Sequence, residues 1–157
     1  MKRTLLILVF LAACVPPAAL TPVAPPQRAF PVAASRAATW DAALSALDTA
    51  QILTIASTDP VSGLILGRPR ILPGDWPADA VAACPRWLGL SQTPDLLQWS
   101  IRVAGDSDTS TLFVNIHYSL GAPDGGRIQC TSLGFFERHI AAAVMAGALQ
   151  RTTAIHH

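Results

Sequence analysis

The chain has 157 residues, of which 51% are hydrophobic and 13% are charged, and its formal net charge is +1. This length suits a single domain with an extension. The basic residues are few and scattered, which argues against a nucleic-acid partner, because such binding depends on a clustered positive surface.

The first 14 residues have the composition of a bacterial export signal. Lys2 and Arg3 precede an apolar run of roughly ten residues, Leu5–Ala13, which is too short to span a bilayer. The quartet LAAC at positions 11–14 resembles the lipobox of bacterial lipoproteins. The resemblance implies that the peptide before Cys14 is cleaved, that Cys14 is linked to diacylglycerol, and that the new amino terminus is acylated.

Processing at this site changes the chain that has to fold. Cleavage before Cys14 removes a 13-residue signal peptide and leaves 144 residues, with nine basic and ten acidic side chains and a net charge of about −1. Val15, rather than Asp, follows the cysteine. Under the usual bacterial sorting rule, this implies attachment to the periplasmic face of the outer membrane, where the acyl chains suffice for a stable anchor.

A proline-rich segment follows the lipobox. Residues 15–34 contain six prolines, which fix φ and remove backbone donors, so this stretch cannot build a core. We expect an extended tether of up to ~60 Å, at about 3.1 Å per residue, rather than a proline-recognition motif. The predicted organisation is a tether over residues 14–38, a folded domain over 39–151 and a tail over 152–157.

The predicted domain opens with a helix and a hairpin. Apolar residues recur at helical spacing over Trp40–Ala50, with Thr39 as a plausible N-cap. Two runs of strand-forming residues, Ile52–Ser57 and Leu64–Gly67, then flank a polar turn. Gly63 supplies the positive φ that closes such a hairpin.

An irregular stretch spans residues 69–98, where five prolines break up any long element. A structureless loop of this length is unusual, so we expect helical turns over Ala78–Ala83 and Pro94–Gln98. Trp76 and Trp87 are the apolar side chains expected to hold this loop against the domain.

Regular structure is predicted to return in the last third of the chain. Residues Trp99–Val103, Thr111–Leu120 and Arg127–Thr131 show the apolar and polar alternation of half-buried antiparallel strands. A final helix follows, capped by Ser132 and ending near Gln150. The predicted fold class is α+β: an antiparallel sheet of about five strands with two helices packed on one face, in the order α-β-β-loop-β-β-β-α.

The cysteines fit an exported protein. With Cys14 assigned to the lipid, Cys84 and Cys130 remain as an even pair in a chain expected to face an oxidising compartment, and we predict that they form a disulfide. Two buried free thiols are one alternative and a redox or metal pair is another. The chain has no CxxC motif, and no histidine lies at ligand spacing from either cysteine.

This layout resembles small bacterial envelope lipoproteins, and two stretches carry the likeness. Residues 40–66 read as a helix followed by a hairpin, and residues 130–137, CTSLGFFE, are similar to a Cys-x-Ser-x-Gly-x-x-Glu stretch that opens the last helix of such proteins. The arrangement also resembles the helix-grip domains of BamC, the outer-membrane assembly lipoprotein. The resemblance implies the helix-grip fold, but BamC has two such domains, so its partnership is not transferred to any residue of this chain.

The residues with catalytic potential are dispersed. Ser132 stands at a strand-to-helix junction like the serine of a G-x-S-x-G nucleophile elbow, but Cys130 occupies the first glycine position. A hydrolase would also need His117 or His139 and a carboxylate within hydrogen-bond reach of Ser132. We therefore predict no catalytic residue, and no metal site or cofactor, because HxxxH and HxH spacings are missing from the sequence.

These observations favour a lipid-anchored, non-catalytic interaction or assembly module of the bacterial cell envelope, whose partners are the membrane and an envelope protein. The first alternative is a module that binds a small apolar or lipid ligand between the sheet and its helices. A hydrolase is the third hypothesis.

Overall fold

The computed structural model describes residues 28–49, 53–72, 78–85 and 92–154. The signal peptide, Cys14, residues 15–27, Trp76 and Trp87 lie outside the described residues. The described elements follow in the order β1 (Ala29–Val32), α1 (Arg36–Thr49), β2 (Ile55–Asp59), β3 (Leu64–Gly67), β4 (Arg70–Ile71), α2 (Ala78–Val81), β5 (Ala82–Ala83), β6 (Leu96–Gly105), β7 (Ser110–Gly121), β8 (Arg127–Ser132) and α3 (Phe135–Ala154).

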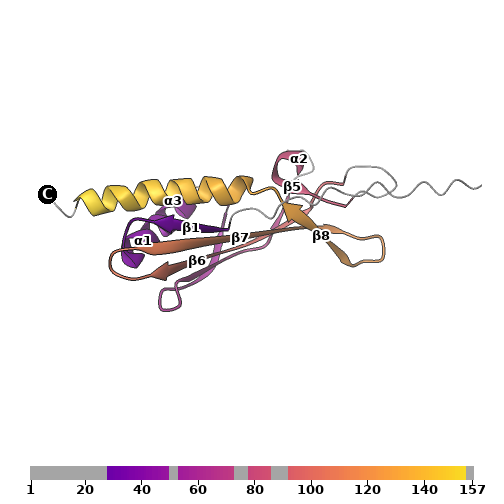
Figure 1. Ribbon diagram of the computed structural model, residues 1–157. Coiled ribbons are helices and arrows are strands. Elements are labelled where there is room, and N and C mark those ends of the chain that lie inside the picture. The colour runs from indigo at the N-terminus through magenta and orange to yellow at the C-terminus, as the bar shows by residue number, and fades with distance from the viewer. Residues whose placement is uncertain (1–27, 50–52, 73–77, 86–91, 155–157) are drawn as a thin grey trace, which may run out of the picture.

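The strands form one antiparallel sheet around a long central hairpin (Figure 1). Strands β6 and β7 pair without interruption from Leu96↔Ser119 to Gly105↔Ser110. The main path is β2-β3-β6-β7-β8-β5, while β1 pairs with the first third of β7 and β4 with the start of β6. Within the described residues the sheet has eight strands, rather than the five expected, because β1, β4 and β5 are short strands added at its edges.

The alternating pattern of β6 and β7 places most of their apolar side chains on one face of the sheet, whereas Leu96 and Phe113 occupy partly exposed positions on the other face. The side chains of the first group are nearly inaccessible to water, and the polar residues between them face the other side. Burying such a row stabilises the fold by roughly 2 kcal/mol per large side chain. The central core residues are Leu97, Trp99, Ile101, Val103, Leu112, Val114, Ile116 and Tyr118.

Helices α1 and α3 cover this face, which confirms the predicted α+β class with two helices on one side of an antiparallel sheet. The two helices approach closely because small residues meet where they cross. A Cβ atom built on Gly147 would lie 3.4 Å from Cβ of Ala42. The hydroxyls of Thr39 on α1 and Ser110 on β7 share a buried hydrogen bond of 2.8 Å, which fixes α1 to the sheet.

The described fold begins earlier than the predicted boundary at residue 39. Strand β1 lies inside the stretch predicted to be tether, and its Phe30 and Val32 side chains are buried. Pro31 alternates with them on the exposed side, where a peripheral strand tolerates the missing N–H. Helix α1 begins at Arg36 rather than Trp40, because Ser35 Oγ accepts the amide of Ala38 and caps the helix.

The middle of the chain differs from the prediction at two places. Residues 94–98 were expected to form a helical turn, and this was wrong: β6 begins at Leu96, whose neighbour Leu97 is fully buried and pairs with Tyr118. The other predicted turn, over Ala78–Ala83, is present in part: α2 spans Ala78–Val81, whereas Ala82 and Ala83 form β5. Helix α3 continues to Ala154, into the stretch predicted to be a tail.

Candidate functional site

The junction between β8 and α3 is the most polar part of the interior. Ser132 ends β8, Gly134 adopts a φ of 77°, and α3 begins at Phe135. The carbonyl of Gly134 accepts the amide of Arg138 at 3.1 Å, so Gly134 occupies the N-cap position that was predicted for Ser132. Ser132 Oγ instead accepts the Gly134 amide at 3.1 Å and braces the turn that precedes the helix.

Three buried polar side chains belong to this region: Ser132 and Glu137, which are hydrogen-bonded, and Tyr118, which is close enough to feel the charge of Glu137. We call them the buried polar cluster. Ser132 Oγ donates to Glu137 Oε1 at 2.6 Å, and Glu137 has no exposed surface. Glu137 Oε2 and the Tyr118 hydroxyl have no hydrogen-bond partner among the described residues. Burial, and secondly the negative charge of Glu137, raise the pKa of Tyr118 well above its ordinary value.

The disulfide lies beside this cluster. Sγ atoms of Cys84 and Cys130 are 2.01 Å apart, so the structure pairs the two cysteines as predicted. Cys130 is registered opposite Tyr118 on β7, and the disulfide continues the β5–β8 ladder, in which Ala82 faces Ser132. That ladder has two registered pairs, and the disulfide adds a covalent link between the end of β5 and β8.

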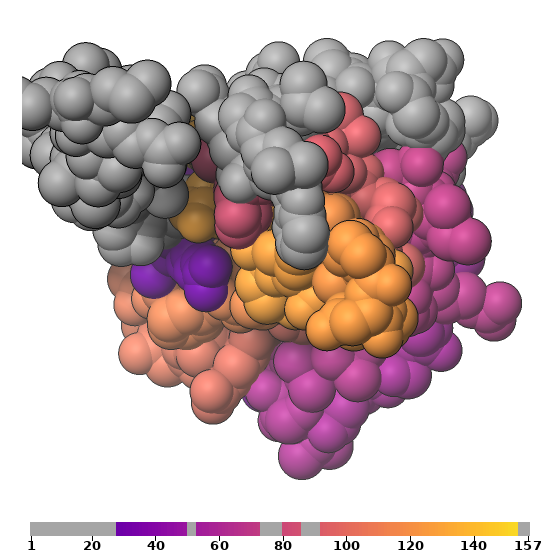
Figure 2. Space-filling model, turned by 90° about the vertical axis from the view of Figure 1, so that its right-hand side faces the viewer, coloured from indigo at the N-terminus to yellow at the C-terminus, as the bar shows by residue number. Residues whose placement is uncertain are grey.

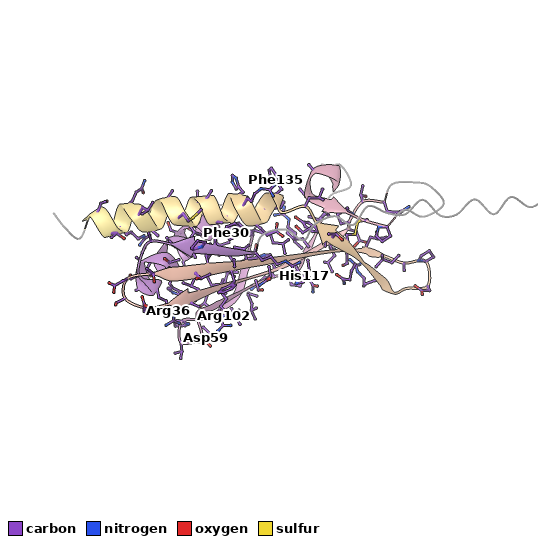
Figure 3. All side chains as sticks on the ribbon, viewed as in Figure 1. Phe30, Arg36, Asp59, Arg102, His117 and Phe135 are labelled. Carbon is purple, nitrogen blue, oxygen red and sulfur yellow. A yellow bond between two sulfur atoms is a disulfide. The ribbon has the colours of Figure 1, made fainter. Side chains whose placement is uncertain are left out.

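The two described histidines, His117 and His139, lie away from Ser132. His117 is exposed on the face of β7 opposite to Tyr118 (Figure 3). His139 is exposed on α3, where its ring stacks on Phe135 with centroids 6.3 Å apart. The described residues therefore bring Ser132 together with a carboxylate but with no histidine. No group of three or more metal-ligating side chains gathers within the part of the chain that the structure describes.

A groove of about 690 Å³ separates α1 and α3 on the outer surface. The space expected to hold a ligand, between the sheet and its helices, is instead filled by the buried core side chains. The groove walls are mostly small and uncharged: Ala42, Ser45, Ala46, Leu47 and Thr49 from α1, and His139, Ile140, Ala143, Ala146, Gly147, Gln150 and Arg151 from α3.

Next to the groove, α3 exposes a continuous row of side chains that sequence reasoning missed. The six exposed residues recur at alternating spacings of four and three, and we call them the α3 stripe. Phe135 and Leu149 are 48% and 51% exposed, although both are large and apolar. No charged residue occurs between Arg138 and Arg151. The α3 stripe comprises Phe135, His139, Ala142, Ala146, Leu149 and Thr153.

A second hollow, of about 450 Å³, lies at the start of α1, and its polar groups are already engaged. The Arg36 guanidinium donates to the carbonyls of Pro60 and Val61 at 2.7 and 2.8 Å, which fixes the β2–β3 turn to the helix. Hydrogen bonds from Ser62 lower the pKa of Asp59 in that turn. We interpret this region as a structural clamp.

Figure 2 presents the end of the molecule that carries the turn between β7 and β8, in orange. Comparison with the known protein families gives no match, and comparison with curated protein sequences gives none either.

Among the described helices, none combines the length and the apolar character needed to cross a bilayer.

Proposed function

We propose that this chain is a lipid-anchored, non-catalytic interaction module on the periplasmic face of the bacterial outer membrane. The observation that carries the proposal is Cys14 in the quartet LAAC, directly behind a basic start and a short apolar run. The Cys84–Cys130 disulfide supports it, because structural disulfides are typical of oxidising compartments such as the periplasm.

The structure shortens the tether of this proposal. Because β1 joins the sheet at Ala29, the linker between the anchor and the fold is at most residues 15–28. At about 3.1 Å per residue, a fully extended polyproline-like linker reaches on the order of 40 Å, instead of ~60 Å. The domain is therefore held within roughly its own length of the membrane surface.

The polar chemistry of the fold supports a role in interaction. Ser132 and Glu137 satisfy one another in the interior, with 3% and 0% exposed surface, so neither is placed to meet a substrate. Two accessible features of α3 are mostly apolar and uncharged, namely the α3 stripe and the groove, which shares His139 and Ala146 with the stripe and also includes Arg151. Exposed apolar patches of this kind are typical of protein contacts, and we propose an envelope protein as the partner.

Fractionation of bacteria that express the full chain tests the anchor. We expect the wild type in the outer-membrane fraction and Cys14→Ser in the soluble or uncleaved fraction, with an unchanged melting temperature of the domain. Val15→Asp should move the protein to the inner membrane, whereas the matched control Val15→Ser should not. Recovery of Cys14→Ser with the outer membrane would contradict the lipobox assignment.

The second candidate function is binding of a small apolar ligand, which the groove favours. Its volume falls in the range of small-molecule sites, about 300–1,000 Å³. Displacement of a fluorescent fatty acid tests this function. Ala143→Trp, which fills the groove, should abolish probe binding, whereas Gln98→Trp on the opposite face of the sheet should leave it unchanged. If Ala143→Trp bound the fluorescent fatty acid as well as Gln98→Trp, the groove would be excluded as the ligand-binding site.

A further inference from the structure

The groove between α1 and α3 and the second hollow follow one another along α1. The residues of α1 that line the groove lie between Ala42 and Thr49, and those that line the hollow lie between Arg36 and Asp41. The two cavities meet at an ion pair: Arg151, which lines the groove, lies 3.9 Å from Asp41, which lines the hollow. A single ligand can therefore extend from one cavity into the other.

The two cavities differ in charge. Among the described residues that line the groove, Arg151 alone has a formal charge, and most of the other side chains are apolar or small. The second hollow is lined by two carboxylates, Asp41 and Asp106, and by the aromatic side chain of Trp40. A ligand that lies along the two cavities thus meets an apolar wall first, then a positive charge, and then negative charges.

The second hollow also contains a cation, Arg36, but its guanidinium donates to carbonyls of the β2–β3 turn. Asp106 is fixed in a similar way, because its Oδ1 accepts the amides of Thr109 and Asp108 at 3.0 Å. These hydrogen bonds lower the pKa of Asp106, so its carboxylate is charged at neutral pH. With one cation and two carboxylates, the described lining of the hollow has a net charge of −1.

The ion pair between the cavities is accessible to a ligand. The side chains of Arg151 and Asp41 are 43% and 60% exposed. An exposed pair of this kind contributes little to stability, so each side chain can exchange its partner for a ligand group of opposite charge. A guanidinium is well suited to phosphate, and an ammonium group is attracted both to carboxylates and to the face of an indole ring.

A phospholipid carries its charges in the same order as these cavities, because its phosphate lies next to the apolar part and its ammonium group lies beyond the phosphate. We propose that the groove and the second hollow together bind a zwitterionic phospholipid with a single acyl chain. The chain lies in the groove and the phosphate binds Arg151. The ammonium group lies against Asp41, Asp106 and Trp40. This proposal rests on the second candidate function, ligand binding in the groove, and adds the class of ligand.

The length of the groove and the order of the charges both suit this ligand. His139 and Arg151, which line the groove, are 12 positions apart on α3, or about 18 Å, so an extended acyl chain can lie between them. A fatty acid would satisfy Arg151 but would bring a second carboxylate close to Asp41. An alkylammonium ion would place its positive charge beside Arg151. Only a zwitterion in the phospholipid order avoids a contact between like charges.

Calorimetric titration of the full-length protein, kept soluble in an amphipathic polymer, tests the proposal. The three probes share one alkyl chain and differ in headgroup: dodecylphosphocholine, dodecanoate and dodecyltrimethylammonium, each below the concentration at which it forms micelles. We expect dodecylphosphocholine to bind at least about tenfold more tightly than either of the others. Ala143→Trp, which fills the groove, should abolish the binding of all three probes.

Exchange of the two charges gives the sharpest variant. Asp41→Arg combined with Arg151→Asp keeps the ion pair and the net charge but reverses the order of the charges along the site. We expect it to bind dodecylphosphocholine at least about tenfold more weakly, with a nearly unchanged melting temperature. Asp106→Asn, which keeps an acceptor for the turn, should also weaken dodecylphosphocholine binding. The matched control, Asp108→Asn in the same turn, should not, because Asp108 lies outside the described lining of the hollow.

The possible failures separate this proposal from the function on which it rests. Equal affinity for the three probes, tightest binding of dodecanoate or dodecyltrimethylammonium, or full affinity of the exchange variant for dodecylphosphocholine would overturn the phospholipid assignment and leave the groove as a site for apolar ligands. If the exchange variant did not fold, equal effects of Asp106→Asn and Asp108→Asn would overturn it instead. Binding of none of the probes would overturn both the phospholipid assignment and the second candidate function.

Discussion

Glu137 is a carboxyl group enclosed by protein on every side. Its Oε1 accepts the Ser132 hydroxyl, while Oε2 has no hydrogen-bond partner among the described residues. An unsatisfied buried polar atom costs about 1–3 kcal/mol, so the Ser132 contact is the feature that makes this burial tolerable. The same hydroxyl also accepts the amide of Gly134, and one oxygen atom therefore organises both the turn and the start of α3.

Ser132→Ala should destabilise the domain strongly although it removes a single hydroxyl group, because that hydroxyl makes two buried hydrogen bonds. The change leaves Glu137 Oε1 and the Gly134 amide without their partner, and we expect a loss of about 1–3 kcal/mol in the free energy of unfolding. Urea denaturation measures it. The matched control is Ser107→Ala in the exposed β6–β7 turn, which should stay within about 0.5 kcal/mol of the wild type. Equal effects of the two changes would contradict this account of the junction.

Tyr118 offers a direct test of the buried polar cluster, because it is the only tyrosine in the chain. Absorbance at 295 nm thus reports the ionisation of this one phenol. Burial and the neighbouring Glu137 raise the pKa of Tyr118 in the folded state, so no tyrosinate should appear at pH values near 10, where an exposed tyrosine is half ionised.

The raised pKa of Tyr118 makes the free energy of unfolding decrease at high pH. The unfolded chain releases the phenol proton above about pH 10 and the folded chain retains it, so Tyr118 contributes stability that is fully present below pH 10 and is lost progressively above it. We expect the 295 nm signal to rise together with alkaline unfolding, as followed by circular dichroism. Tyr118→Phe should remove the signal. A tyrosinate signal near pH 10 in protein that is still folded would contradict the burial of this group.

At the scale of the elements, Gly63 shows how one turn is matched to the strand beside it. Gly63 has a φ of 70°, and its carbonyl accepts the amide of Val103 at 2.8 Å. A Cβ at this position would lie 2.1 Å from the carbonyl oxygen of Val103. Gly125, in the β7–β8 turn, has a similar φ of 83°, but a Cβ there would meet nothing within 4 Å.

Alanine substitution at these two glycines distinguishes the stability cost of a positive φ from the added cost of a steric clash. Gly125→Ala should cost about 1 kcal/mol of unfolding free energy, the usual penalty for a left-handed non-glycine residue. Gly63→Ala carries the same penalty and also forces β3 away from β6, which adds about 1–3 kcal/mol. Thermal denaturation of both variants measures the difference. If the two variants melted at the same temperature, the close approach of Gly63 to Val103 would be wrong.

The elements that the sequence predicted are those with long, uniform patterns. The alternation over Trp99–Val103 and over most of Thr111–Leu120 revealed the buried face of β6 and β7 before the structure. The start of β6 was missed, because Pro94 suggested a helical turn over residues 94–98. Strand β1 was missed because Pro31 and its proline-rich surroundings suggest a linker, whereas the local pattern, Phe30 and Val32 buried on either side of Pro31, spans only four residues. Strands β4 and β5 have two residues each, which is too short to produce a pattern.

The same reasoning explains what was missed at the β8–α3 junction and on α3. Ser132 and Glu137 are five residues apart, and their contact depends on the left-handed Gly134 between them, which no spacing rule anticipates. Alanines on every side of α3 hide which face is exposed, because alanine is tolerated equally in a core and on a surface. The α3 stripe therefore became visible only once the sheet had defined the buried side.

For the whole molecule, the feature that matters most is how the connection between β4 and β6, residues 72–95, is attached to the sheet. Between β4 and β6 the described residues comprise α2, β5 and the flanking positions of residues 78–85 and 92–95. Strand β5 has two registered pairs with β8, and the amide of Leu133 donates to the carbonyl of Val81 at 2.9 Å. The amide of Leu72 also donates to the carbonyl of Asp95 at 2.9 Å. Among the described residues of this connection, Cys84–Cys130 is the covalent link to β8.

Removal of the disulfide should therefore affect the whole domain. It closes a loop with a sequence separation of 46, and its loss releases chain entropy in the unfolded state worth about 4 kcal/mol, or less if the unfolded chain retains structure. We expect the double variant Cys84→Ser, Cys130→Ser to lose about 2–4 kcal/mol in urea denaturation while the β6–β7 hairpin keeps its native pairing, as seen by amide hydrogen exchange. A reductant should destabilise the wild type by the same amount and leave the double variant unchanged. A loss below about 1 kcal/mol would mean that α2 and β5 are held by their noncovalent contacts alone, and the disulfide would then have no structural role in joining this segment to β8.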